Sequence, residues 1–101
     1  MIVVSGEITL DPADRAAAVE AATAATTATL EEEGCLTYGF WADPADDGRF
    51  RVFEEWASID ALIAHFGRPH MAAFLDAMAG LTIHGSDIHQ YEVTDKRPVG
   101  T

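Results

Sequence analysis

The chain has little of what several protein classes require. It contains one cysteine, and six Lys and Arg stand against 17 Asp and Glu. A single cysteine excludes an intrachain disulfide. The formal net charge of −11 argues against nucleic-acid and membrane partners, because an acidic surface repels phosphate groups and anionic headgroups. No apolar run approaches the ~20 residues that span a bilayer. No glycine-rich nucleotide fingerprint, P-loop or serine triad motif is present, so no nucleotide cofactor is expected.

The remaining composition is that of an ordinary globular domain. At 101 residues, 49% of them apolar and 23% charged, the chain fits one domain covering residues 1–101. No linker, repeat or charge block divides it. The opening MIVVSGEITL is apolar but lacks the basic region of a signal peptide, so a cytoplasmic location is the default expectation.

The first third of the chain predicts a strand followed by a long helix. Residues 2–10 alternate as a strand does, and Gly6 leaves room on one face for a ligand or another backbone. Asp11 and Pro12 suit a helix start, and the Ala-rich stretch 12–33 favours helix up to Gly34. The expected inner stripe of this helix is Val19, Thr23, Thr26 and Leu30. Three acidic residues close this helix, and they either form its solvated end or have a role in function: Glu31, Glu32 and Glu33.

Two strands, two helices and a last strand follow. Strands are predicted at 35–41 and 49–56, joined by the turn-rich segment 43–48. Helices are predicted from Ser58 to Phe66 and from Pro69 to Gly80, and a strand at 81–93 with a bulge or break at Gly85. The order βαββαβ is the ferredoxin-like pattern of an α+β fold with an antiparallel sheet. Helices cover one sheet face only, which predicts a homodimer that covers the other.

Glu54 is a charged residue within an apolar alternation. In strand 49–56, Phe50, Val52, Glu54 and Trp56 share one face. If that face is buried, burial raises the pKa of the Glu54 carboxyl unless cations or hydrogen-bond donors hold it ionised. His65, on the flank of the following helix, is a candidate partner for proton transfer near neutral pH. The alternative is that Glu54 only accepts hydrogen bonds from buried donors.

The other candidate site residues are histidines and aromatic residues. His70 lies at the edge of an apolar helix stripe and is either a pocket residue or a surface histidine. Five aromatic residues could form a pocket, although such residues more often belong to the core, and we expect two of the five to contact a ligand: Tyr38, Trp41, Trp56, Phe66 and Tyr91. The four histidines match no familiar zinc spacing, so no metal is expected. Cys35 reads as a buried small residue without an activating neighbour.

Taken in order, these features resemble the antibiotic-biosynthesis monooxygenase family, in particular its quinol-monooxygenase-like branch. The matching features are Glu33-Gly34-Cys35-Leu36-Tyr38, the hairpin, Glu54-x-Trp56, Ser58-x-x-Ala61-Leu62, and His65 followed by Pro69-His70. The resemblance implies a ferredoxin-like fold paired into a dimeric α+β barrel. The haem-degrading branch of the family is a poorer match, because Gly6 and Phe74 stand where its Asn and His are expected.

The resemblance also implies a chemistry. Members oxygenate small aromatic substrates, often phenols, quinols or polyketide intermediates, with O₂ and without flavin or metal, in a pocket between helices and sheet. By this resemblance the cavity, the hydrogen-bonding group and the orientation come from Glu54, Trp56, His65 and Tyr38. Together with the candidates above, we expect Glu54 and His65 to be catalytic and the substrate contacts to be Tyr38, Trp41, Trp56, Phe66 and His70. Two hypotheses follow: a cofactor-independent monooxygenase, or a non-catalytic domain that binds a small hydrophobic ligand.

Overall fold

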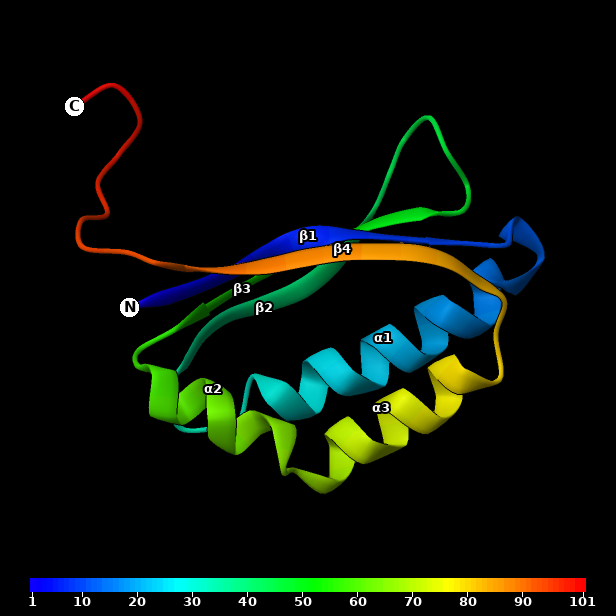
Figure 1. Cartoon of the computed structure of the whole chain (residues 1–101), viewed down its shortest axis with the longest axis horizontal. Helices are drawn as coiled ribbons and strands as arrows, with labels where there is room; N and C mark the ends of the chain where they lie inside the picture. Colours follow the sequence, from blue (N-terminus) through cyan, green and yellow to red (C-terminus); the bar gives the residue numbers. More distant parts are fainter.

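The computed structural model describes all 101 residues as one sheet covered on one face by three helices (Figure 1). The strands are β1 (Ile2–Leu10), β2 (Cys35–Ala42), β3 (Arg49–Trp56) and β4 (Ile83–Glu92). The α-helices are α1 (Arg15–Thr29), α2 (Ile59–Phe66) and α3 (Pro69–Ala79), with a 3-10 turn, Pro12–Asp14, before α1. The sheet is antiparallel, in the order β2-β3-β1-β4. The predicted ferredoxin-like α+β fold is therefore confirmed.

Helical structure begins at Pro12 as expected, but first as a 3-10 turn, and helix α1 itself is shorter than predicted. Asp11 caps the 3-10 turn that leads into α1, with Oδ1 accepting a hydrogen bond from the backbone N–H of Ala13 at 2.9 Å. The helix stops at Thr29, whereas the prediction ran to residue 33. Residues after Thr29 turn instead toward Gly34, whose φ of +84° is the left-handed conformation that glycine adopts without strain. This turn directs Glu32 into the molecule rather than along the helix surface.

The inner face of α1 is also different from the predicted stripe. The buried residues are Ala18, Ala25 and Thr29, while Val19 and Leu30 are exposed. The reason is steric, because small side chains let the helix lie close to its neighbours and larger ones do not fit there. Composition alone does not distinguish these two faces of an Ala-rich helix.

The strand predictions that rest on alternation are confirmed. In β3 the residues Phe50, Val52, Glu54 and Trp56 are all buried on the helix-covered face. β1 pairs with β3 so that Ile2 is opposite Trp56 and Val4 is opposite Glu54. Gly6 is needed for the approach of another backbone: a Cβ there would lie 2.2 Å from the carbonyl oxygen of Asp87 in β4.

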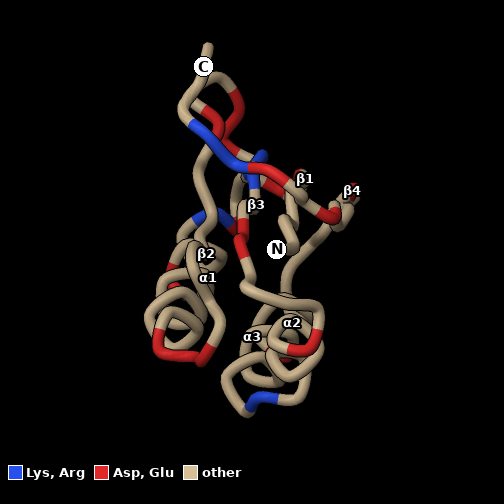
Figure 2. Tube along the Cα trace, turned by 90° about the vertical axis from the view of Figure 1, so that its left-hand side faces the viewer, with Lys and Arg blue, Asp and Glu red and all other residues tan.

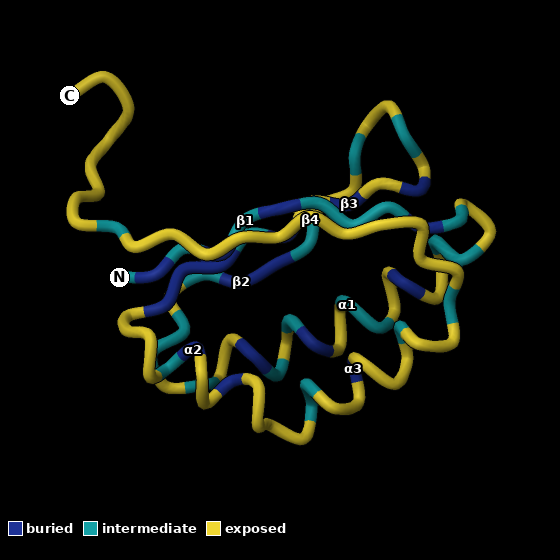
Figure 3. Tube along the Cα trace, viewed as in Figure 1, coloured by how far each residue is buried: buried dark blue, intermediate teal, exposed yellow.

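The core consists of two groups of buried side chains on this face. One group is Ile2, Val4, Tyr38, Trp56 and Leu62, and the other is Leu10, Ala18 and Phe50, against which Met78 packs. Every residue of β4 is exposed, and this strand runs along the edge of the sheet (Figure 3). No helix covers the opposite face of the sheet (Figure 1).

Charge is distributed over the whole molecule rather than collected in one place. Acidic positions occur in both the sheet and the helical layer, and they outnumber the basic ones (Figure 2). None of the helices combines the length and the apolar character that crossing a bilayer requires.

Candidate functional site

A cavity of about 380 Å³ lies between the sheet and helices α2 and α3. Its volume is in the usual range for small-ligand sites. Strand residues such as Val4 and Val52 form one wall, and the helices contribute side chains that include Met71 and Phe74. Among all the lining residues, only Glu54 and Tyr38 can ionise, and none is a Lys, Arg or His. The cavity therefore suits an uncharged, largely apolar molecule with a group that hydrogen-bonds.

Glu54 is the single carboxyl group in the cavity wall. Its Oε1 accepts a hydrogen bond from the indole N–H of Trp56 at 2.8 Å. Burial raises the pKa of Glu54 above its usual value, and the Trp56 hydrogen bond and the nearby His65 only partly oppose this. Once ionised, the carboxylate is a stronger base than an ordinary surface carboxylate, which is the property that proton abstraction from a bound ligand requires.

Tyr38 is the second polar group in the cavity wall. Burial raises the pKa of its phenol well above the usual range, and the neighbouring Glu54 raises it further. The hydroxyl group therefore keeps its proton and can donate a hydrogen bond to a ligand. Its ring also contacts the ring of His65, with centroids 5.4 Å apart in an edge-to-face arrangement.

His65 is buried, but it does not line the cavity. Its side chain is 1% exposed, and its ring packs against Trp56 with centroids 4.9 Å apart. No hydrogen bond joins His65 to Glu54, its candidate partner for proton transfer. Trp56 instead connects the two, since it donates to Glu54 and stacks on His65. The hydrogen-bond partner of His65 is Glu32, which the sequence did not suggest.

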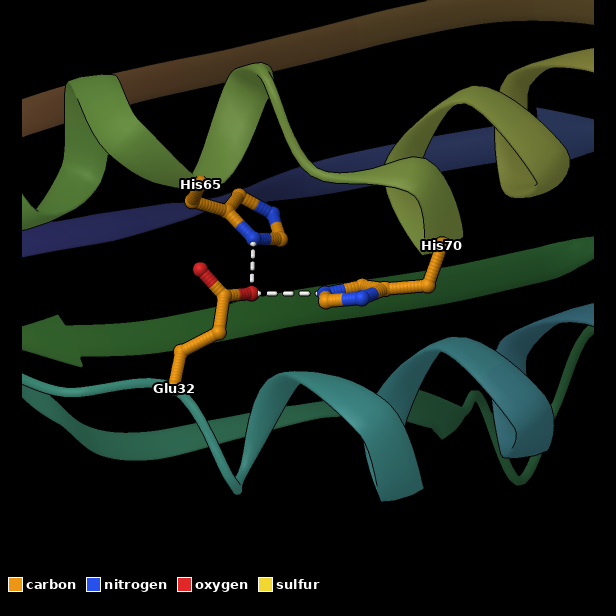
Figure 4. A group of neighbouring side chains, drawn as sticks. All are labelled: Glu32, His65 and His70. Carbon is orange, nitrogen blue, oxygen red and sulfur yellow. Dashed lines mark hydrogen bonds and ion pairs between the residues drawn. The ribbon is translucent and has the colours of Figure 1, made fainter.

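Glu32 is the centre of a buried polar cluster with His65 and His70. One of its oxygens, Oε2, lies 2.7 Å from Nδ1 of His65 and 2.7 Å from Nε2 of His70 (Figure 4). Burial opposes ionisation of Glu32, but the hydrogen bonds from the two histidines outweigh it and hold its pKa below the usual value. The carboxylate therefore accepts from both imidazoles.

The three acids at the end of α1 have different environments. The prediction of a solvated helix end is correct for Glu31 and Glu33, which are exposed, and wrong for Glu32, whose side chain is 4% exposed. Glu32 is 33 and 38 residues away from the two histidines, so no local spacing could indicate the cluster. One potential ligand atom from each of Glu32, His65 and His70 lies within 4.8 Å of the other two, so these three residues could hold a metal ion.

The aromatic residues divide between cavity, core and surface. Of the expected substrate contacts, Tyr38 and Phe66 line the cavity. Trp56 is fully buried behind it, Trp41 is half-exposed over an outer groove beside α1, and His70 lies between α1 and α3. Aromatic character indicates that a residue is large and apolar but not which side of the strand or helix it occupies. Burial raises the pKa of the Cys35 thiol to about 11, which fits an unreactive cysteine.

Fold and cavity together define a ferredoxin-like domain with a largely apolar cavity over its sheet. The family model for antibiotic biosynthesis monooxygenases matches residues 1–77, and the chain belongs to this family. An uncharacterised protein of Synechocystis is 28% identical over 94 residues. That match covers 93% of this chain, which spans 64% of the relative's length.

Solved structures show the same fold. A protein from Deinococcus radiodurans, provisionally described as an antibiotic biosynthesis monooxygenase, superposes with a TM-score of 0.90 at 24% identity over the whole of both chains. A similarly described protein from Caulobacter crescentus has 26% identity and a TM-score of 0.83, over 93% of this chain and 90% of the other. A protein from Mycobacterium tuberculosis has a TM-score of 0.85 at 24% identity, over 96% and 98%. Membership of the family supports a general monooxygenase-like role, and the solved structures show that the fold is shared.

Proposed function

We propose that the protein is a monooxygenase that needs neither flavin nor metal and oxidises a small quinol, phenol or polyketide-type aromatic compound with O₂. The observation that carries the proposal is the cavity of about 380 Å³, which is apolar apart from Glu54, Tyr38 and Ser86. An aromatic ring with one or two hydroxyl groups matches this lining in size and polarity. The cavity wall has no cation, which argues against carboxylated or phosphorylated substrates.

In this proposal Glu54 accepts a hydroxyl proton from the substrate. The resulting anion is electron-rich enough to reduce O₂, so the substrate supplies all the electrons. One oxygen atom enters the ring and the other leaves as water, so that a hydroquinone plus O₂ gives a hydroxyquinone plus H₂O. Tyr38 orients the ring by donating a hydrogen bond. Trp56 and His65 hold Glu54 in place and favour its ionised form.

One observation favours the alternative, a domain that binds a small hydrophobic ligand without turnover. Both ionisable groups in the cavity wall have raised pKa values, so each holds its proton more firmly than usual. A site of this kind is suited to donating hydrogen bonds to a neutral ligand. The two readings differ only in whether Glu54 ionises when the ligand is present.

Oxygen consumption separates the two functions. Purified protein, treated with EDTA and kept under air, is mixed with a panel of freshly reduced quinols, and an oxygen electrode records uptake above the rate of autoxidation. The proposed function predicts enzyme-dependent uptake that EDTA does not reduce, with one oxygen atom from ¹⁸O₂ in the product. Saturable binding of the same quinols without uptake would support the binding domain instead.

We also propose that the protein is a homodimer. The uncovered sheet face carries apolar side chains, among them Tyr91 of β4, which is 52% exposed and pairs with Val3 of β1. Sedimentation at micromolar concentration is expected to give a dimer. Tyr91→Glu is expected to shift the equilibrium toward monomer, because it places a charge in the interface. Val99→Glu, in the fully exposed C-terminal segment, is the matched control. A stable monomer of the unmodified protein would contradict this proposal.

A further inference from the structure

Glu32, His65 and His70 converge from three separate segments on one point. Glu32 follows the end of α1, His65 is in the last turn of α2, and His70 is in the first turn of α3 (Figure 4). Both imidazoles direct a nitrogen at the same carboxylate oxygen, each at 2.7 Å. Two imidazoles and one carboxylate are a common ligand set of zinc and of non-haem iron.

Hydrogen bonds within the cluster do not satisfy it completely. The second oxygen of Glu32, Oε1, is buried and accepts no hydrogen bond. The nearest cation is the guanidinium of Arg68, whose Nε lies 3.4 Å from Oε1. The Arg68 side chain is 47% exposed, so it can move into solvent at little cost. A buried carboxylate oxygen without a donor is costly, and a cation that binds directly to the carboxylate would remove that cost.

The geometry is close to what a metal ion needs. Bonds of ~2.0–2.2 Å from a metal to imidazole nitrogen and carboxylate oxygen place neighbouring ligand atoms roughly 3 Å apart. The three ligand atoms here already lie within 4.8 Å of one another, so side-chain adjustments of under about 1 Å suffice. Glu32 and His65 are held rigidly, since their side chains are 4% and 1% exposed. His70, at 24% exposed, provides the entry path from solvent.

The surroundings support the ligands as well. The ring of His65 packs against Trp56 and Tyr38, which fixes its orientation and excludes water on that side. Three protein ligands leave at least one coordination position, and the partly exposed side at His70 is where water would fill it. His89 and Asp87 provide a useful contrast, because this pair has the same 2.7 Å separation but lies exposed on β4 without a third ligand.

We propose that Glu32, His65 and His70 form a binding site for one divalent transition-metal ion, Zn²⁺ or an ion of similar preference. Metal binding is measured without turnover, so this proposal stands or falls separately from the oxygenase function. Both proposals give a role to His65. The ring of His65 packs against Trp56, which donates to Glu54, so metal binding can alter the placement of Glu54; the oxygenase proposed above is the metal-free form.

The test is a Zn²⁺ titration of the full chain, stripped with EDTA and dialysed, in competition with a chromophoric chelator. We expect about one ion per chain, bound with a Kd of about 1 µM or tighter. His70→Ala removes a ligand at the exposed side and is expected to weaken binding by at least ~100-fold, more than the loss of a supporting residue causes. Glu32→Gln keeps the shape of the side chain but lacks the charge, and is expected to weaken binding similarly.

Two controls make the result specific. His89→Ala alters the exposed His–Asp pair and is expected to leave the Kd unchanged. Co²⁺ in place of Zn²⁺ is expected to give visible d–d absorption bands in the unmodified protein and not in His70→Ala, with circular dichroism confirming that the variant is folded. Absence of tight binding to the unmodified protein, or the same Kd in His70→Ala and Glu32→Gln, would overturn the proposal and leave the cluster as a hydrogen-bonded one.

Discussion

Replacing Glu54 by Gln is expected to lower the rate of quinol oxygenation by about 10²–10⁴-fold, the usual cost of losing a general base. Glutamine keeps the shape of the side chain, and its carbonyl oxygen still accepts the indole N–H of Trp56. The variant therefore removes proton transfer while leaving the cavity wall intact. The measurement is kcat/KM from oxygen uptake, with the autoxidation rate subtracted.

The neighbouring residue offers a matched control for this substitution. Glu55 is also buried on β3, but it lies on the opposite sheet face, where Thr37 donates to it at 2.6 Å. Glu55→Gln is expected to retain turnover. His65→Ala, which removes the ring that packs behind Trp56, is expected to reduce turnover through the placement of Glu54. Equal rates in Glu54→Gln, His65→Ala and the unmodified protein would show that both residues are structural.

Glu54→Gln is also expected to change how the stability of the protein depends on pH. Burial raises the pKa of Glu54 in the folded state, so the folded protein binds this proton more tightly than the unfolded chain does. The contribution of protonated Glu54 to the free energy of unfolding is therefore fully present below the unfolded pKa of about 4.5. It is lost as the pH rises through the folded pKa. Glu54→Gln has no such loss, so its stability relative to the unmodified protein should increase from pH 4 to pH 8.

What the sequence reveals about this site depends on the range of the interactions involved. The burial of Glu54 was predictable, because alternation along one strand places it with Phe50, Val52 and Trp56 whatever the rest of the fold does. The role of Glu32 was not, because its direction depends on where α1 ends and on how the following turn meets α2. Gly34 marks that turn in the sequence, but nothing local specifies which of the three preceding acids turns inward.

The pairing of His65 illustrates the same limit. The sequence places it on the helix that follows β3, and in the structure it is buried there together with Leu62, whereas Ile59 and Ile63 of the same helix are exposed. The choice between Glu54 and Glu32 as its partner is made by distances across the fold. Trp56 donates a hydrogen bond to Glu54 and packs its ring against His65, and the imidazole bonds to Glu32 instead.

Replacing Glu32 by Ala is expected to lower the free energy of unfolding by about 3 kcal/mol at pH 7 in the presence of EDTA. The value corresponds to two hydrogen bonds to a charged acceptor, at about 1.5 kcal/mol each. The lower end of the usual range applies because His70 and Arg68 can turn to water once the carboxylate is gone. For a domain of this size, the change corresponds to roughly 12–24 °C in Tm.

The control for this prediction is the next residue along the chain. Glu33 has the same charge, is exposed, and makes no side-chain hydrogen bond or ion pair, so Glu33→Ala is expected to stay within about 0.5 kcal/mol of the unmodified protein. Chemical denaturation at one fixed protein concentration is the measurement, since association would make stability depend on concentration. If both variants lose stability equally, the acids act through net charge alone. Glu32→Gln is expected to lose less stability than Glu32→Ala, because its amide oxygen still accepts one imidazole N–H. If Glu32→Ala loses stability and Glu33→Ala does not, the buried cluster joins the end of α1 to α2 and α3.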